Sequence, residues 1–251
     1  FYGSVWDGSA WVSLTMPTNT GNGNVRCGAV SNGGATWVFG NSSGTRLRVF
    51  DWDGTTFTGR AIAGATTVPN WVDISHDGQT IVAGYNASPY IEMWERQDVS
   101  GVISYQKVGN IFGGIAQAQT LRARFNAQGD RLCIPAATTA NTRIMKKVGG
   151  VWSVHSDVAR GGSLPAVAWH PDGTAFAIAF DGGAAGSGAP DPVRIYKENV
   201  DGTAYEQVSG FTVAENTAPD FLEFSEDGQI LAMVNGVPLV QCCYVSPSYQ
   251  M

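Results

Sequence analysis

A four-residue turn recurs five times in this sequence, and its spacing constrains the fold more than any other feature. It reads SNGG at 31–34, SHDG at 75–78, NAQG at 126–129, HPDG at 170–173 and SEDG at 225–228. The last glycines of these turns are 44, 51, 44 and 55 residues apart. Gly, Asn and Asp tolerate the positive φ angles of tight turns between strands. A repeat of about 49 residues holds four short strands and their loops, so it predicts the blades of a β-propeller.

The stretch 71–96, WVDISHDGQTIVAGYNASPYIEMWER, shows the repeating unit. It predicts a first strand, the turn, a second strand rich in β-branched residues, and a third strand with alternating polarity. A fourth strand follows a glycine-containing turn in four repeats and carries an aromatic residue: Phe57, Tyr105, Trp152 or Tyr205. The third and fourth strands hold most of the Lys and Arg, which is typical of the outer strands of a blade.

Columns of equivalent residues flank each turn. Four positions before its last glycine, the residues are large and apolar: Val30, Ile74, Phe125, Trp169 and Phe224. Three positions after that glycine they are again large: Trp37, Ile81, Leu132, Phe176 and Leu231. One position further they are mostly small: Val38, Val82, Cys133, Ala177 and Ala232. Apolar residues in both neighbouring columns predict second strands that are buried on both faces, between stacked sheets.

We therefore expect an all-β propeller with about five four-stranded blades, forming one domain over residues 1–251. The segment 1–16 matches a third and a fourth strand with no first or second strand before them. We expect it to complete the last blade and close the ring, which leaves one strand without a place. The expected repeats lie near 25–70, 71–120, 121–165, 166–220 and 221–251.

The composition excludes several classes of partner. Charged residues make up 14% of the chain, the formal net charge is -6, and no Lys/Arg cluster occurs. We therefore expect no nucleic-acid partner and no binding to an anionic membrane surface. No apolar run approaches the length of about 18 residues that spans a bilayer, so we expect no membrane insertion. The four cysteines form no CxxC pair, which predicts free buried thiols and neither a metal site nor another cofactor.

The turn and its flanking strands resemble a known group of repeats. SHDGQTIVAGYNASPYIEMWE, HPDGTAFAIAF and SEDGQILAMVNG resemble WD-type propeller repeats. Together with VFDWDGTTFTG and VRIYKENVDGTAYEQV, they are similar to the blades of bacteriophage virion proteins, in tail fibres and related particle components. The WD dipeptides, Trp6-Asp7 and Trp52-Asp53, lie at outer-strand turns. The hydrogen-bonded network of true WD repeats is therefore not expected.

This resemblance implies a non-catalytic structural or attachment component of a virus particle, or a capsid decoration, assembled in the host cytoplasm. Its implied partners are other virion proteins and a host-surface glycan or protein. Loops carry recognition in such a module, and the two expected docking loops are 112–119 and 184–188. The candidate binding residues in these loops are Phe112, Ile115, Gln117, Gln119 and Ser187.

One column carries the alternative, enzymatic hypothesis. Five positions before each last glycine stand Ala29, Asp73, Arg124, Ala168 and Glu223. On inner strands, Asp73 and Glu223 with Arg124 between them would form a charged site at the propeller axis. This arrangement fits a five-bladed carbohydrate-active hydrolase, in which one carboxyl has a raised pKa. The simpler interpretation, which we favour, is a structural network around a wet channel in which the arginine neutralises both acids.

The remaining signals do not favour an enzyme. His76 and His170 lie in the repeated turns, while His155 ends a fourth strand, and none has the spacing of a metal site or a catalytic triad. We predict three solvated histidines. A third hypothesis is an intracellular protein-interaction propeller.

Overall fold

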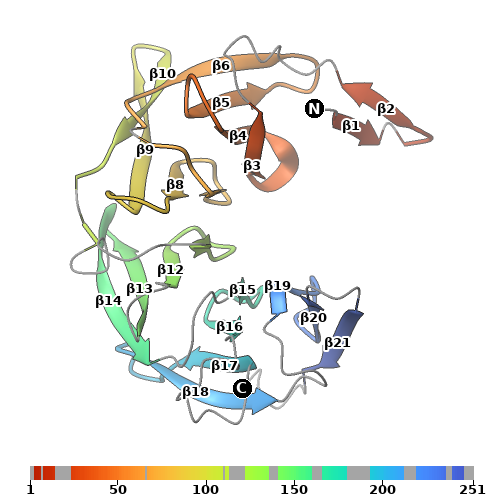
Figure 1. Cartoon of the computed structure of the whole chain (residues 1–251), viewed down its shortest axis with the longest axis vertical. Helices are drawn as coiled ribbons and strands as arrows, with labels where there is room; N and C mark the ends of the chain where they lie inside the picture. The colour runs from red at the N-terminus through yellow and green to blue at the C-terminus, as the bar shows by residue number, and fades with distance from the viewer. Residues whose placement is uncertain are drawn as a thin grey trace.

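The computed structural model describes residues 3–6, 8–14, 24–65, 67–109, 111–112, 122–135, 141–159, 166–179, 193–211, 219–235 and 239–245. Over these residues the chain forms 21 strands and one 3-10 turn, η1 (Asn32–Gly34). The sheets are arranged radially in an arc around a common axis (Figure 1). Within the same residues, no helix has the length and hydropathy needed to cross a membrane.

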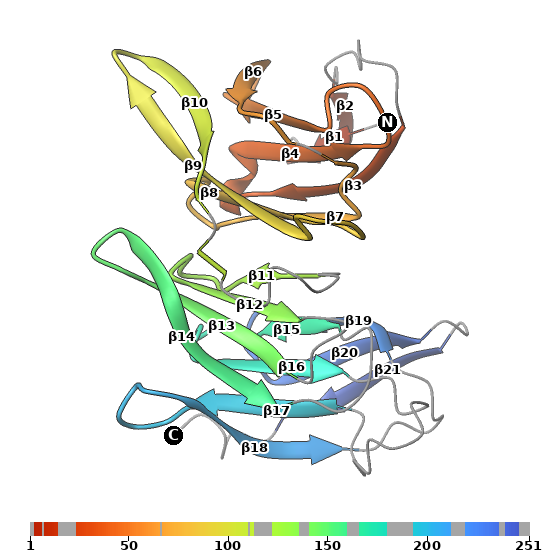
Figure 2. The ribbon, with the colours of Figure 1, turned by 60° about the vertical axis from the view of Figure 1, so that its left-hand side comes forward.

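Five blade units follow one another along the arc. In each unit the first strand lies nearest the axis (Figures 1 and 2). Blades one and two contain β3 (Val25–Val30), β4 (Thr36–Asn41), β5 (Leu47–Trp52), β6 (Phe57–Ile62), β7 (Trp71–Ile74), β8 (Thr80–Gly84), β9 (Ile91–Val99) and β10 (Val102–Lys107). Blade three contains β11 (Arg124–Phe125), β12 (Arg131–Pro135), β13 (Asn141–Val148) and β14 (Val151–Ala159). Blades four and five contain β15 (Val167–Trp169), β16 (Ala175–Ala179), β17 (Val193–Glu198), β18 (Tyr205–Phe211), β19 (Pro219–Phe224), β20 (Ile230–Asn235) and β21 (Leu239–Tyr244).

Neighbouring strands within a blade are antiparallel. Blades one and two are not independent of each other, because their outer strands are joined. The outer strands β6 and β10 pair in parallel, with Ala61 opposite Ser104 and Ile62 opposite Tyr105. Blades one and two therefore share one eight-stranded sheet. The N–H of Ala63 also donates to the carbonyl oxygen of Tyr105 at 3.0 Å. This pairing removes one exposed edge from each of the two blades.

The repeated turn, hereafter the marker turn, is closed by the same hydrogen bonds each time. In blade two, Ser75 N donates to Thr80 O at 2.8 Å, and Gly78 N donates to Ser75 O at 2.8 Å. The Ser75 hydroxyl accepts a further bond from Thr80 N at 2.9 Å. The last glycine has a φ of +70°, which side chains with a Cβ rarely adopt. The corresponding backbone bonds form at Ser31, Asn126, His170 and Ser225.

In blades two to five, the last glycine of the marker turn is also the contact to the preceding blade. A Cβ atom on Gly78 would lie 3.7 Å from the Cβ of Ser31, and one on Gly228 would overlap the His170 ring. In the first four marker turns, the residue that opens the turn therefore lies beside the glycine of the next turn. These contacts join Gly78 to Ser31, Gly129 to Ser75, Gly173 to Asn126 and Gly228 to His170.

The apolar core lies between the blades. Four clusters of buried residues occupy the four successive interfaces between blades one and five. The strands β8 and β16 are buried along their whole length, so both faces of these second strands are covered. The predicted burial of the large column holds in blades two to five, where Ile81, Leu132, Phe176 and Leu231 are 0% exposed. Trp37 of blade one is only partly buried. On β20 of blade five, Ile230 and Val234 are 42% and 37% exposed, so the prediction that second strands are buried on both faces is wrong there.

Closure of the ring by the N-terminal segment is not formed in the part of the chain that the structure describes. There, β1 (Gly3–Trp6) and β2 (Trp11–Leu14) pair only with each other, as a separate two-stranded sheet. The last blade contains three strands, ordered β19-β20-β21. Figure 1 shows the hairpin on the blade-one side of the arc, away from β21. Five blade units do not curve far enough to bring these two ends together.

Three further expectations are corrected. Phe112 is 2% exposed and belongs to the core between blades two and three, so its ring is not available to a partner. The four cysteines are free, but only Cys133 is buried, since Cys27 and Cys243 are partly exposed and Cys242 is exposed. The His155 and His170 side chains are only 9% and 13% exposed, and they lie 3.3 Å from Glu198 and 3.1 Å from Asp172, so neither is a freely solvated histidine. Ile115, Gln117, Gln119 and Ser187 lie outside the described residues.

Substituting alanine at two marker glycines tests the contact between turns. Both Gly34 and Gly228 have positive φ, so each alanine variant loses about 1–2 kcal/mol to backbone strain. Only at Gly228 does the new methyl group overlap a neighbouring ring, which adds about 1–3 kcal/mol. Gly228→Ala should therefore lower the urea midpoint more than Gly34→Ala. Equal losses would show that the turns do not support one another.

Candidate functional site

Two cavities follow the propeller axis and together form an axial channel. The first, of about 320 Å³, lies among the marker turns. The second, of about 400 Å³, lies toward the other end of the inner strands. Val30, Asp73 and Arg124 line both cavities, so the two spaces meet at these side chains. Volumes of this size fall within the range of small-molecule sites, roughly 300–1,000 Å³.

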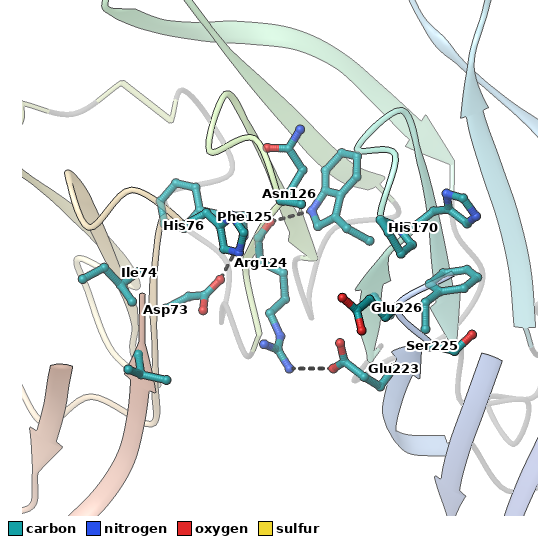
Figure 3. A pocket seen from close by; sticks show the side chains of 16 residues that line it. Asp73, Ile74, His76, Arg124, Phe125, Asn126, His170, Glu223, Ser225 and Glu226 are labelled. Carbon is teal, nitrogen blue, oxygen red and sulfur yellow. Dashed lines mark hydrogen bonds and ion pairs between the residues drawn. The ribbon is translucent and has the colours of Figure 1, made fainter. Parts of the chain in front are cut away.

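The inner strands bring the charged column together at this meeting point. All five of its residues line the channel: Ala29, Asp73, Arg124, Ala168 and Glu223. Figure 3 shows Asp73, Arg124 and Glu223 converging from three different blades. The guanidinium Nη2 of Arg124 lies 3.7 Å from Glu223 Oε2. Side chains alternate between the two faces of a strand. Residues at the same position relative to the marker turn therefore face the axis in every blade.

Arg124 is held in place from both sides. Trp169 Nε1 donates to the Arg124 carbonyl oxygen at 2.7 Å, which fixes the backbone of β11 against blade four. The guanidinium lies 5.9 Å from the centre of the Phe221 ring, in cation–π geometry. Its side chain is 32% exposed, whereas that of Glu223 is 57% exposed. The arginine is therefore oriented but still open to a ligand in the channel.

Asp73 is the buried member of the group. Its Oδ2 atom accepts a hydrogen bond from Phe125 N at 2.9 Å. Burial raises the pKa of Asp73 to about 6, against the opposing effects of Arg124 and the Phe125 N–H, and Glu223 adds to the increase. A carboxyl of this kind changes protonation state near neutral pH and is suited to general acid–base chemistry.

The second cavity is cationic and aromatic. Arg122 precedes Arg124 by two residues, and both line it. Trp71 and Phe221 contribute two aromatic rings to the same space, while Gly28 and small neighbours leave room beside them. Guanidinium groups bind carboxylates and phosphates, and aromatic faces pack against the apolar faces of sugar rings.

These additional lining residues were not predicted from the sequence, although the sequence holds a signal for them. Trp71, Arg122 and Phe221 all stand seven positions before the last glycine of a marker turn. The positions seven and five residues before this glycine are two residues apart, which is one period of a strand. Side chains in both columns therefore face the axis. Among the described residues, no three His, Cys, Asp or Glu side chains are grouped as a metal ion would require.

No protein-family model and no curated protein sequence matches this chain. Solved structures do match it. A periplasmic gluconolactonase of Pseudomonas aeruginosa aligns with a TM-score of 0.66 at 12% identity, over 91% of this chain and 70% of that one. A protein from Lactobacillus plantarum aligns at 0.68 and 15%, over 98% and 74%. A candidate 6-phosphogluconolactonase of Bacteroides uniformis aligns at 0.62 and 14%, over 88% and 67%.

These matches establish the fold: the chain is an all-β protein similar to solved β-propeller structures, of which two have the word lactonase in their names. The predicted propeller is confirmed. The predicted resemblance to virion proteins receives no support from these structures. At 12–15% identity they say nothing about which molecule this chain binds.

Asparagine at position 73 tests the burial of this carboxyl. Between the ordinary pKa near 3.9 and about 6, the folded state keeps a proton that the unfolded chain has lost. The free energy of unfolding therefore falls as pH rises through this window. Asp73→Asn keeps an acceptor for Phe125 N and removes the titration. It should be about 1–3 kcal/mol more stable than the parent at pH 7.5, and equal to it below pH 4.

The measurement is urea unfolding at a series of pH values. Asp201→Asn, at an exposed position, controls for the change in net charge. A difference between Asp73→Asn and the parent that stays constant with pH would contradict a raised pKa.

Proposed function

We propose that this protein binds a small sugar acid, or its lactone, in the axial channel without transforming it. The observation that carries the proposal is the second cavity, where Arg122 and Arg124 lie beside the rings of Trp71 and Phe221. The two guanidinium groups supply donors for a carboxylate. The rings supply flat apolar surface for the carbon chain or ring of the ligand.

The acidic groups complete the fit to this ligand class. Asp73 lines this second cavity, and Glu223 lines the first cavity, which meets the second at Arg124. Carboxylates accept hydrogen bonds from sugar hydroxyl groups. A ligand with one anionic group and several hydroxyls matches both sets of side chains. Two of the similar structures are named as a gluconolactonase and a candidate 6-phosphogluconolactonase. Both names refer to this class of compound.

Calorimetric titration with gluconate, and with glucose as the uncharged analogue, tests this binding. Gluconate should bind, and glucose should bind at least tenfold more weakly, because the arginines then lack a charged acceptor. Arg122→Gln should weaken gluconate binding about tenfold or more. Arg26→Gln, which changes an exposed arginine outside both cavities, is the matched control. Equal binding of gluconate by all three proteins would contradict the proposal.

The second candidate function is hydrolysis of a lactone, the enzymatic alternative drawn from Asp73, Arg124 and Glu223. The raised pKa of Asp73, about 6, favours it. Ionised Asp73 would take a proton from water as the water oxygen bonds to the lactone carbonyl carbon, beside Arg124. The ring C–O bond then breaks, and the ring oxygen takes the proton back from Asp73 and leaves as a hydroxyl, which gives the free acid and restores the Asp73 carboxylate.

The test measures lactone hydrolysis as the rate at which protons are released after glucono-lactone is added. The rate of the spontaneous reaction is subtracted. Catalysis by Asp73 requires a rate that rises with pH through about 6 and is lost in Asp73→Asn. A rate no faster than the spontaneous one at every pH leaves binding alone as the function of the channel.

A role in attachment to a host surface is compatible with the same channel, which would then take an acidic sugar at the end of a glycan. This setting in a virus particle rests on the sequence resemblance alone. Mass-spectrometric detection of the chain in purified particles is the observation it requires. Absence of the chain from such particles would remove it.

A further inference from the structure

The charge of the axial channel differs between its two ends. Asp73 and Arg124 line both cavities, so they do not distinguish one end from the other. Of the two cavities, Arg122 lines the second alone, whereas Glu223 and Glu226 line the first alone. Figure 3 shows the carboxylates of Glu223 and Glu226 directed into the first cavity from blade five. The end at the marker turns is therefore acidic, and the opposite end is cationic.

In the middle of the channel, opposite charges neutralise each other. Arg124 Nη2 lies 3.7 Å from Glu223 Oε2, which is the distance of an ion pair. Neither Arg122 nor Glu226 forms an ion pair with another residue that the structure describes. One positive and one negative charge without a protein partner therefore lie at opposite ends of the same channel.

The walls of the acidic cavity also suit a cationic group. Phe125, Trp169 and Phe224 contribute rings to this cavity, and aromatic faces attract ammonium groups. Asp73 is only 8% exposed, and its carboxylate accepts a hydrogen bond from Phe125 N. A carboxylate accepts about four hydrogen bonds, so Asp73 has acceptor positions left for a ligand. The exposed Glu226 alone attracts an ammonium group only weakly in water, and these walls supply the rest of the site.

The spacing of the charges sets the length of the ligand. Arg122 stands seven positions before the last glycine of its marker turn, and Glu223 stands five positions before the corresponding glycine. Successive residues of an extended chain are about 3.3 Å apart, so these two levels of the channel differ by about 7 Å. The extended chain of a six-carbon sugar acid covers a similar distance. A positive group on its last carbon therefore reaches the acidic cavity, whereas one next to the carboxylate stays beside the arginines.

We propose that the channel binds a zwitterionic sugar acid whose ammonium group lies at the opposite end of the carbon chain from its carboxylate. The carboxylate lies beside Arg122 and Arg124. The ammonium group lies in the first cavity, beside Asp73, Glu223 and Glu226. This inference rests on the proposed function, because the carboxylate uses the same two arginines. It adds a second charge, which orients the ligand along the axis in one direction.

Calorimetric titration with 6-amino-6-deoxygluconate and with gluconate tests the added charge. Two histidines line the first cavity, and a pH of about 8 favours neutral imidazole rings while an alkyl ammonium group keeps its proton. We expect the 6-amino compound to bind at least about fivefold more tightly than gluconate, because its ammonium group meets the carboxylates. The isomer 2-amino-2-deoxygluconate has the same net charge and is the matched control ligand. It should show no such gain.

The variant Glu226→Gln separates this inference from the proposed function. It removes the acidic charge that no described residue neutralises, and it leaves both arginines in place. The affinity for gluconate should stay within about twofold of the parent value, whereas the gain for the 6-amino compound should fall by about half or more. Glu206→Gln, which changes an exposed glutamate outside both cavities, is the matched control and should keep the full gain.

The outcomes distinguish the two proposals. Binding of gluconate with no gain for the 6-amino compound, or with an equal gain for the 2-amino isomer, would overturn this inference and leave the proposed function standing. A full gain that persists in Glu226→Gln would overturn the position assigned to the ammonium group. Absence of binding by all three compounds would overturn the proposed function and this inference together.

Discussion

The contact between a marker glycine and the turn before it is the constraint on which the rest of the fold depends. Its geometry admits no side chain at the glycine of blade five, where the His170 ring fills the space. The same turns are fastened by hydrogen bonds across blades, such as Asn32 N to His76 O at 3.0 Å. Because every turn rests on its neighbour, the inner strands stand side by side around one axis. Residues at a fixed distance from the turn then converge there, whatever their separation in sequence.

Away from the axis, charge pairs join each blade to the next one along the chain. Arg96 of blade two donates to both carboxylate oxygens of Asp51 in blade one, at 3.0 and 2.8 Å. Burial opposes ionisation of Asp51, but hydrogen bonds from Arg96, Arg60 and Thr36 lower its pKa. Partly buried charges are costly unless paired, and these partly buried side chains are paired across the blade interface. The corresponding pairs further along are Glu95–Lys147 and Glu198–Arg131.

Structural features that recur in every repeat could be predicted from the sequence, whereas features that occur at only one place could not. The marker turns and apolar columns predict the blades, the cores between them and the meeting of Asp73, Arg124 and Glu223, because each follows from strand alternation. The burial of Phe112 does not follow, because an aromatic residue in a long connection gives no sign of whether it faces a core. The pairing of β6 with β10 and the pairing of His155 with Glu198 join segments with no shared pattern. Closure fails as a prediction because counting strands does not reveal how strongly successive blades curve.

Exposure across the axial site follows the shape of the arc. Asp73 is buried between blades two and three, while Glu223, on blade five at the end of the arc, has a side chain that is 57% exposed. The Arg124 guanidinium therefore lies between the buried carboxyl of Asp73 and the exposed carboxyl of Glu223. Interactions between charges strengthen when water is removed from around them. At an equal separation, the charge of Arg124 therefore interacts more strongly with the Asp73 carboxylate than with that of Glu223.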